Sequence, residues 1–408
     1  MSHSLELPNG NDPAGDGPRI AFDAATLRIV LDRILPPSIV ADLQSSDKPR
    51  RELIAALGSE DIFRPCIRGI SEDDDPRSAH VNVRALATLI EQLALQNCWG
   101  LTLSVALHVG VFLPLIARLA HPVQRQMIIA SAAAGRLLGA VAATDLMAAG
   151  SDFMGMETTA TFDGPSIILR GTKTFITSAT IADYAVVFAR WRPGRHFSNF
   201  CSLLVPLDQQ GVLRRAIPME VMRGAGVGSL TFNDVRLPEH ALLGRRELGM
   251  RYFLDHIGME RLIAGVWALA IGERELRDTQ KHLLRRQIGA ASLWQRDAVR
   301  QRLAESIAQL ALLRSLVSET LIEADANGFV DPLRSAIIKA TAPATLERII
   351  GTCLQFHGAA GLSQGNHLLR SLTELRAFAI GGGSTETMLE LIANSWPFTK
   401  SPGGWLNA

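Results

Sequence analysis

Hydrophobic residues recur at helical spacing in the first third of the chain. Between residues 83 and 95 most of them have another one three or four positions away, as along one face of an amphipathic helix: Val83, Leu86, Leu89, Ile90, Leu93 and Leu95. The stretch from Leu101 to Leu119 is apolar on all sides, which is typical of a helix buried inside a protein. These patterns predict a helical N-terminal domain over residues 21–135.

The pattern changes between residues 136 and 244. Short apolar or β-rich runs are separated there by Gly, Pro, Asp and Asn: Ser166–Leu169, Tyr184–Phe188, Cys201–Val205 and Leu230–Phe232. Short runs of this kind, bounded by turn residues, predict several short strands. We therefore expect a middle β domain, built as a small barrel or sandwich.

Helical spacing returns over residues 245–398. One predicted helix carries an apolar stripe: Val299, Leu303, Ile307, Leu310, Leu313 and Val317. Another carries Gly258, Gly265 and Gly272, each seven residues from the next. Because a glycine inside a helix costs about 1 kcal/mol relative to alanine, this row predicts very close packing against another backbone. The order of helices, strands and helices predicts a mostly α protein with a central β domain.

Composition narrows the class of protein. The 408 residues are 47% hydrophobic and 20% charged, with a formal net charge of +1. A nearly neutral chain of this kind does not indicate a positively charged surface for binding nucleic acid. The four cysteines are widely spaced and form no CxxC pair, so neither a disulfide framework nor a metal site is expected, and a reducing cytoplasm fits.

Three segments outside the motifs also carry expectations. Residues 1–20 are rich in Gly, Asn, Asp and Pro and lack the pattern of a signal peptide, so we expect a disordered N-terminus. Residues 399–408 are expected to form a tail. Gly100–Ala117 is about as long as a membrane span, but its Ser, Thr, His and Pro residues favour a buried helix over a span.

Four segments carry recognisable motifs. They are Thr144–Asp152, Leu169–Thr177, Leu230–Pro238, and Leu354–Gly358 taken with Gly381–Glu386. Together, and in this order, they resemble the acyl-CoA dehydrogenase family over nearly all of residues 80–395. The resemblance implies a helical domain, a small β-barrel and a C-terminal four-helix bundle. It also implies FAD between the last two, reaching into a neighbouring subunit.

The chemistry that this resemblance implies needs a base. An FAD-dependent enzyme of this kind oxidises the Cα–Cβ bond of an acyl thioester, either acyl-CoA or an acyl group on a carrier protein. A carboxylate removes the α-proton, and flavin N5 accepts the β-hydride. Since that proton is only weakly acidic, the site must supply a positioned base and a hydrogen-bond donor to the thioester carbonyl.

The resemblance assigns the base to Glu260. Many family members carry the catalytic glutamate in the last motif, where this chain has Gly382. A second group carries it in a Glu-Arg-Leu motif on an earlier helix, which matches Glu260. The Gly382 N–H then donates to the carbonyl, and Arg261 is assigned to the substrate. By itself a Glu-Arg pair is more often a solvated salt bridge, but the apolar neighbours of Glu260 predict burial and a raised pKa.

The resemblance also assigns residues to FAD. These are Thr144, Ser151, Phe175, Thr177, Arg286, Gln355, Gly358, Ser384 and Glu386, of which Ser151 also serves the substrate. Asp145 stands where the family has glutamate, and the segment at Arg286 lacks the usual aromatic residue. Lys173, near a predicted strand end, is expected to be solvated.

The same resemblance implies partners and leaves alternatives open. It implies an electron-transfer flavoprotein as electron acceptor, and a homodimer or homotetramer. One alternative is a flavin monooxygenase or oxidase on the same fold. Another is a degenerate, non-catalytic subunit that completes the FAD site of a partner, which the altered segment at Arg286 and the Gly381–Gly383 run motivate.

Overall fold

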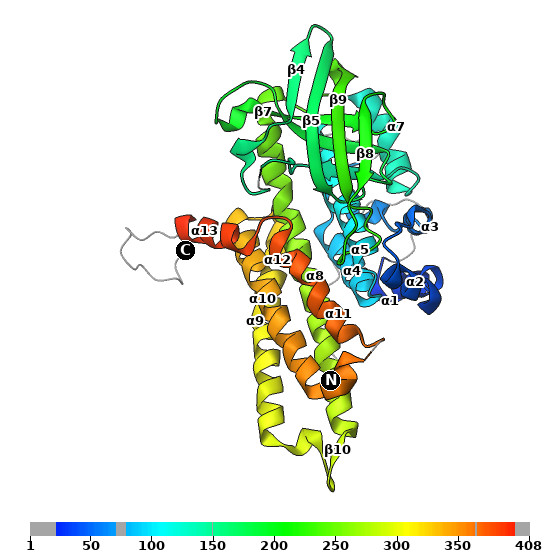
Figure 1. Cartoon of the computed structure of the whole chain (residues 1–408), viewed down its shortest axis with the longest axis vertical. Helices are drawn as coiled ribbons and strands as arrows, with labels where there is room; N and C mark the ends of the chain where they lie inside the picture. The colour runs from blue at the N-terminus through cyan, green and yellow to red at the C-terminus, as the bar shows by residue number, and fades with distance from the viewer. Residues whose placement is uncertain (1–21, 71–78, 149, 364, 396–408) are drawn as a thin grey trace.

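The computed structural model describes residues 22–70, 79–148, 150–363 and 365–395. The predicted disordered N-terminus and the predicted tail lie outside the described residues. Along the chain, helices precede and follow one large sheet, which lies at one end of the molecule with most of the helices below it (Figure 1). This arrangement confirms a mostly α fold with a central β domain.

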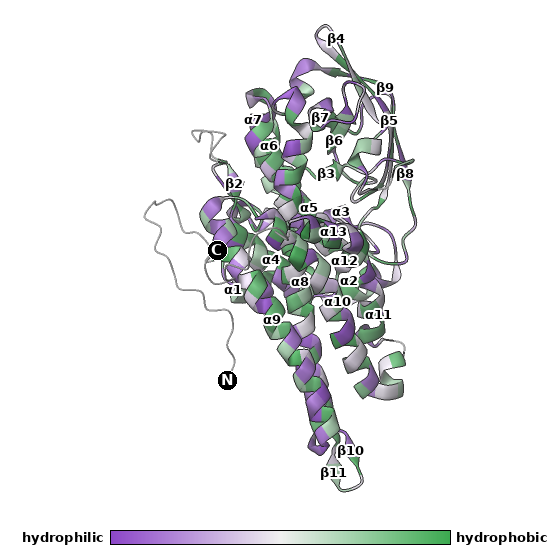
Figure 2. Ribbon diagram, turned by 90° about the vertical axis from the view of Figure 1, so that its left-hand side faces the viewer, coloured by the Kyte–Doolittle hydropathy of each residue, from purple (hydrophilic) through white to green (hydrophobic). Residues whose placement is uncertain are grey.

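The N-terminal part consists of short helices and one small ribbon. The helices are α1 (Ala24–Ile34), α2 (Pro37–Ser45), α3 (Arg51–Ser59), α4 (Val83–Leu95), α5 (Trp99–Leu107), α6 (Leu113–Leu119) and α7 (Pro122–Ala133). Strands β1 (Ile67–Arg68) and β2 (His80–Val81) pair antiparallel. Hydrophobic residues concentrate where α4 and α5 meet the C-terminal helices, whereas the outer helices alternate in hydropathy (Figure 2).

The apolar run that resembled a membrane span is a core helix. Trp99–Leu119 has a mean hydropathy of 2.0, and 89% of its most apolar window is buried inside the protein. A π-helical segment, η3 (His108–Phe112), interrupts it. His108 Nδ1 accepts from the Gly139 N–H at 3.1 Å, so its Nε2 donates to the Ala132 carbonyl at 3.1 Å. Burial lowers the pKa of His108 to about 4, which keeps this ring neutral.

The middle of the chain folds into one curled, mixed sheet of seven strands (Figure 1). The strands are β3 (Gly139–Ala142), β4 (Thr159–Asp163), β5 (Ser166–Ile176), β6 (Tyr184–Arg190), β7 (Phe200–Pro206), β8 (Val212–Ala216) and β9 (Gly228–Pro238). Their order is β3-β6-β4-β5-β9-β8, and β7 pairs with β6. β6 and β7 are buried on both faces, which explains why their sequences are continuously apolar and do not alternate.

Three long helices and a row of short ones form the C-terminal part. The long helices are α8 (Gly249–Arg285), α9 (Asp297–Asn327) and α10 (Pro332–His357). The short ones are α11 (His367–Glu374), α12 (Arg376–Ile380) and α13 (Thr385–Ser395). A hairpin of β10 (Gln287–Ile288) and β11 (Ala291–Ser292) joins α8 to α9. The fourth position of the bundle is therefore taken by short helices that pack on α10.

The glycine row on α8 admits side chains from neighbouring helices. A Cβ on Gly265 would stand 2.5 Å from Ile338 Cγ2, and one on Gly272 would stand 2.8 Å from Leu310 Cδ1. The expectation of another backbone at these two positions is wrong, because branched side chains of α9 and α10 fill the space. The close packing itself is present.

This packing gives a stability prediction. Gly265→Ala is expected to lower the free energy of unfolding by about 1–2 kcal/mol, because the overpacking cost exceeds the gain in helix propensity. Gly351→Ala on α10 is the matched control, since a Cβ there meets nothing within 4 Å; it is expected to gain up to ~1 kcal/mol. Urea unfolding measures both variants. Equal shifts of the same sign would contradict this account of the glycine row.

Candidate active site

Glu260 lies at a partly open position of a buried helix. Between residues 256 and 272 of α8, Glu260 and Ala264 alone keep some exposure to solvent. Burial raises the pKa of the Glu260 carboxyl above its ordinary value, and the positive charges of Lys339 and Arg261 oppose part of that rise. The site therefore holds a carboxylate of increased basicity with access to a ligand.

The Glu260 carboxylate lies where a side chain of residue 382 would begin. A Cβ built on Gly382 would stand 2.8 Å from Glu260 Oε1 and 3.3 Å from its Cδ. Gly382 has a φ of +69°, so a side chain there would also strain the backbone. Two segments more than a hundred residues apart thus converge on one volume. Only one of them can place a side chain in it.

Two cations hold the loop that contains Gly382. Arg261 Nε donates to the Gly382 carbonyl at 3.2 Å. Lys339 Nζ, on α10, donates to the Gly383 carbonyl at 3.0 Å and also to the Phe378 carbonyl. Lys339 is 2% exposed, and burial lowers its pKa to about 8. The sequence motifs missed Lys339; the available signal was a lysine placed among apolar residues of a predicted helix.

Two segments assigned to the flavin ring lie side by side. Thr174 N donates to the Thr144 carbonyl at 3.0 Å, so the Thr144 segment runs along the end of β5. Beside it, Phe175 is 61% exposed and has a φ of +53°, which is unusual for a bulky residue. Leu146 and Met147 are exposed too. This exposed apolar surface fits a flat, apolar ring system such as that of FAD.

A buried ion pair anchors this surface. Lys173 Nζ and Asp145 Oδ1 lie 2.5 Å apart, and their side chains are 0% and 3% exposed. Asp145 also accepts from the Thr158 N–H at 2.7 Å and from the Thr158 hydroxyl at 2.9 Å. The expectation that Lys173 is solvated is wrong, because the strand end is covered by the Asp145 loop. Burial lowers the pKa of Lys173 to about 8, against the pull of Asp145.

Of three further residues assigned to FAD, two are exposed on the surface and one caps a helix. Ser151 is exposed. Ser384 Oγ accepts from the Thr387 N–H at 3.3 Å and so caps α13. Glu386, in the first turn of α13, is exposed.

Three other residues assigned to FAD lie far from Glu260. Arg286 follows the end of α8, and Gln355 and Gly358 are at the end of α10. These two ends are adjacent, since the rings of His282 and His357 stack with centroids 4.3 Å apart. From Glu260 to the end of α8 the helix rises roughly 38 Å. Within one chain this set therefore lies far along α8 from Glu260.

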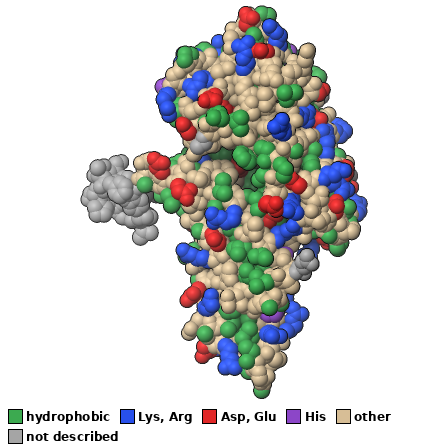
Figure 3. Space-filling view, viewed as in Figure 1, with side chains coloured by type: hydrophobic (Ala, Val, Ile, Leu, Met, Phe, Trp, Pro, Cys, Tyr) green, Lys and Arg blue, Asp and Glu red, His purple; other side chains and the backbone are tan. Residues whose placement is uncertain are grey.

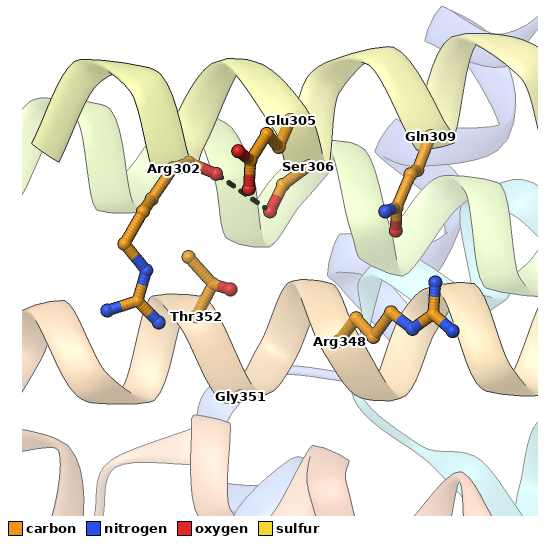
Figure 4. Close-up of a pocket in the computed structure, with 7 residues that line it drawn as sticks. All are labelled: Arg302, Glu305, Ser306, Gln309, Arg348, Gly351 and Thr352. Carbon is orange, nitrogen blue, oxygen red and sulfur yellow. Dashed lines mark hydrogen bonds between the residues drawn. The ribbon is translucent and has the colours of Figure 1, made fainter. Parts of the chain in front are cut away.

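A polar groove lies on the bundle between α9 and α10 (Figure 4). Its lining comes from α9 and α10: Arg302, Glu305, Ser306, Gln309, Arg348, Gly351 and Thr352. None of these residues belongs to the four sequence motifs. The groove is therefore not assigned to the candidate active site.

Comparison with known proteins identifies the class. The middle domain of acyl-CoA dehydrogenases matches residues 140–235, and their C-terminal domain matches residues 247–396. These two stretches make up more than half of the chain. The protein belongs to the acyl-CoA dehydrogenase family, a family of FAD-dependent oxidoreductases that act on acyl thioesters.

Particular relatives extend the likeness over most of the chain. It is 28% identical to the mitochondrial long-chain specific acyl-CoA dehydrogenase of Sus scrofa, across 86% of this chain and 81% of the relative. It is 26% identical to the acyl-[acyl-carrier-protein] dehydrogenase MbtN of Mycobacterium sp. (strain MCS), across 86% of this chain and 88% of that relative.

Solved structures confirm the fold. An acyl-CoA dehydrogenase from Geobacillus kaustophilus superposes with a TM-score of 0.83 at 24% identity, covering 91% of this chain and 96% of that one. An FAD complex of PigA superposes with a TM-score of 0.82 at 21% identity, covering 93% of this chain and 98% of that one.

Proposed function

We propose that this protein dehydrogenates the Cα–Cβ bond of an acyl thioester and that Glu260 is its base. One observation carries the proposal: the Glu260 carboxylate lies 2.8 Å from where a Cβ of residue 382 would stand. Family members with a glutamate in the last motif fill that space from the loop. Glu260 fills it from α8.

The residues of this chain divide the work as follows. Glu260 takes the α-proton as the Cα–H bond breaks, and the Gly382 N–H donates to the thioester carbonyl, where negative charge develops. FAD held beside the substrate would supply the acceptor for the hydride that leaves Cβ as the Cα–Cβ double bond forms. A raised pKa makes Glu260 a stronger base toward a weakly acidic C–H. Arg261 and Lys339 hold the loop, and Arg261 also faces the substrate.

FAD binding is proposed to involve two copies of the chain. Thr144, Phe175 and Thr177 would contact the flavin ring in one copy, with Ser151, Ser384 and Glu386 nearby. Arg286, Gln355 and Gly358 would hold the diphosphate of the FAD in a second copy. The length of α8 between Glu260 and the second set supports this division and a homodimer or homotetramer.

The wider setting follows from the same proposal. The relatives are named for CoA and for carrier-protein thioesters, and either thioester fits the chemistry of Glu260. An electron-transfer flavoprotein in the cytoplasm would reoxidise the flavin.

Anaerobic titration of the purified protein with acyl-CoA and acyl-carrier thioesters tests the proposed function. We expect the flavin absorbance to bleach with one equivalent of substrate and the enoyl thioester to form. Rapid substrate-dependent oxygen consumption would instead indicate an oxidase. A colourless protein that binds no added FAD would indicate a non-catalytic subunit.

The pH dependence of flavin reduction tests the state of Glu260. The base works only when ionised, so the rate is expected to fall as pH falls through the raised pKa of Glu260. The midpoint should therefore lie above 4.5, the ordinary value for a glutamate. Lys339→Met removes a charge that favours the carboxylate and should move the midpoint higher still. Stopped-flow rates across pH measure both. A midpoint at or below 4.5 would contradict the buried setting.

A further inference from the structure

The loop between β8 and β9, residues 217–227, reaches from the sheet down to the helices (Figure 1). On the face shown in Figure 3, the surface is hollowed between the strands and the C-terminal helices. Because side chains do not fill such a hollow, discrete contacts beside it must set the distance between the sheet and the helices. The β8–β9 loop makes contacts of this kind with all three parts of the chain.

Glu374, the last residue of α11, binds this loop from the C-terminal part. Its Oε2 accepts from the Met222 N–H at 2.5 Å, and the two residues are 4% and 3% exposed. Met222 has a φ of +55°, which a bulky residue rarely adopts. Burial raises the pKa of Glu374, whereas the Met222 N–H, Arg370 and Arg223 oppose that rise. Since breaking this bond would leave a buried carboxyl without its backbone donor, the bond holds the loop firmly.

The N-terminal part binds the same loop. Asp47 accepts from the Met219 N–H at 3.1 Å and from the Gly224 N–H at 3.3 Å. The first turn of α5 packs directly on the loop backbone, since a Cβ on Gly100 would stand 2.6 Å from the Met222 carbonyl oxygen. The β8–β9 loop is therefore held by the N-terminal and the C-terminal parts together.

The loop is bonded in turn to the strand end that we propose faces FAD. The Ala225 carbonyl accepts from the Ser178 N–H at 2.9 Å, and Ser178 directly follows Thr177. Ser178 is 2% exposed and has a φ of +63°, so its backbone is tightly fixed. On the other side, the short helix α12 joins Glu374 to the loop that contains Gly382. The Glu374 contact therefore lies between the flavin side and the base side of the candidate active site.

We propose that Glu374 is a positioning residue, which fixes the flavin-facing strand end relative to the base. This inference rests on the proposed function, because the flavin and Glu260 must meet on one substrate. The loop beside the base has restraints of its own, since Arg261 and Lys339 bind its carbonyls. Loss of the Glu374 contact therefore shifts the flavin side and leaves proton removal in place. A misplacement of about 1 Å can cost about 10²-fold in rate.

Glu374→Ala in the FAD-loaded protein separates hydride transfer from proton removal. Flavin reduction by an acyl thioester should slow by about 10–10²-fold, because it needs the flavin and the base on one substrate. A 3-thiaacyl thioester has no β-hydride to lose, so its α-hydrogen exchange in D2O should stay within about threefold of the wild type. Glu374→Gln should recover most of the reduction rate, because its amide oxygen can accept from the Met222 N–H. Glu347→Ala, which removes an exposed carboxylate 3.3 Å from Arg376, is the control and should change neither rate.

A measurement without substrate separates this inference from the proposed function. Amide hydrogen exchange should speed up in residues 176–180 and 217–227 of Glu374→Ala and stay unchanged in Glu347→Ala. Unchanged amide exchange in Glu374→Ala would overturn the inference, and so would equal slowing of reduction and α-hydrogen exchange. If Glu374→Ala does not fold, Glu374→Asp, with its shorter reach, should show the same separation of the two rates, and equal slowing there overturns the inference as well. If no thioester reduces the wild-type flavin, the proposed function fails, whereas the amide exchange still decides whether Glu374 fixes the strand end.

Discussion

Glu260→Gln is expected to slow flavin reduction by an acyl thioester by about 10²–10⁴-fold while FAD stays bound. Glutamine has the same shape but cannot take the α-proton. Thr144 and Phe175, which we propose face FAD, belong to a different part of the fold, so the cofactor should be retained. Single-turnover reduction under anaerobic conditions measures the rate, and the flavin absorbance measures the cofactor content.

Glu390→Gln is the matched control for this substitution. Glu390 is exposed on α13, close in sequence to the Gly382 loop but outside the site. Its loss should leave reduction within about twofold of the wild-type rate, because isolated surface charges contribute little. If the flavin of the Glu260→Gln protein were reduced as fast as that of the Glu390→Gln protein, Glu260 would not be the base.

Lys173→Met is expected to lower the free energy of unfolding by about 3–5 kcal/mol. Asp145 would be left at 4% exposure without its counterion, and burying a carboxyl group without a charged partner is costly. FAD affinity should fall as well, because the ion pair fixes the Thr144 segment beside Phe175. Urea unfolding and FAD titration measure the two effects.

Lys281→Met provides the comparison for Lys173. Lys281 Nζ lies 2.9 Å from Asp278 Oδ1, and both side chains are largely exposed. Loss of that pair should cost no more than about 1 kcal/mol. Asp145→Asn combined with Lys173→Met should recover part of the stability, since no unpaired charge remains. A loss below 1 kcal/mol for Lys173→Met alone would contradict the buried pair.

The hydropathy pattern and the motifs were enough to predict the order of the helices and strands and part of the candidate active site. The apolar run at Trp99–Leu119 predicts a core helix, because a fully apolar helix must be covered by other parts of the protein. The structure confirms that this helix is buried. The strands β6 and β7 follow from their apolar runs. Glu260 and Gly382 were paired only through the family resemblance, since no local pattern links residues so far apart.

Contacts between distant segments explain what the sequence could not predict. Lys173 is buried because Asp145 approaches from another segment, and Lys339 because its amine reaches carbonyls of the Gly383 loop. Neither partner is visible from local spacing. The glycines at 265 and 272 predicted close packing, but the identity of their neighbours depends on how α9 and α10 align with α8.

The most direct test of the central claim is α-hydrogen exchange in D2O. A 3-thiaacyl thioester presents an acidic α-proton and no β-hydride, so mass spectrometry of the recovered analogue reports proton removal alone. We predict that the wild type exchanges the α-hydrogen and that Glu260→Gln does so at least ~10²-fold more slowly. Equal exchange by the two proteins, with equal binding of the analogue, would contradict the assignment of Glu260 as the base.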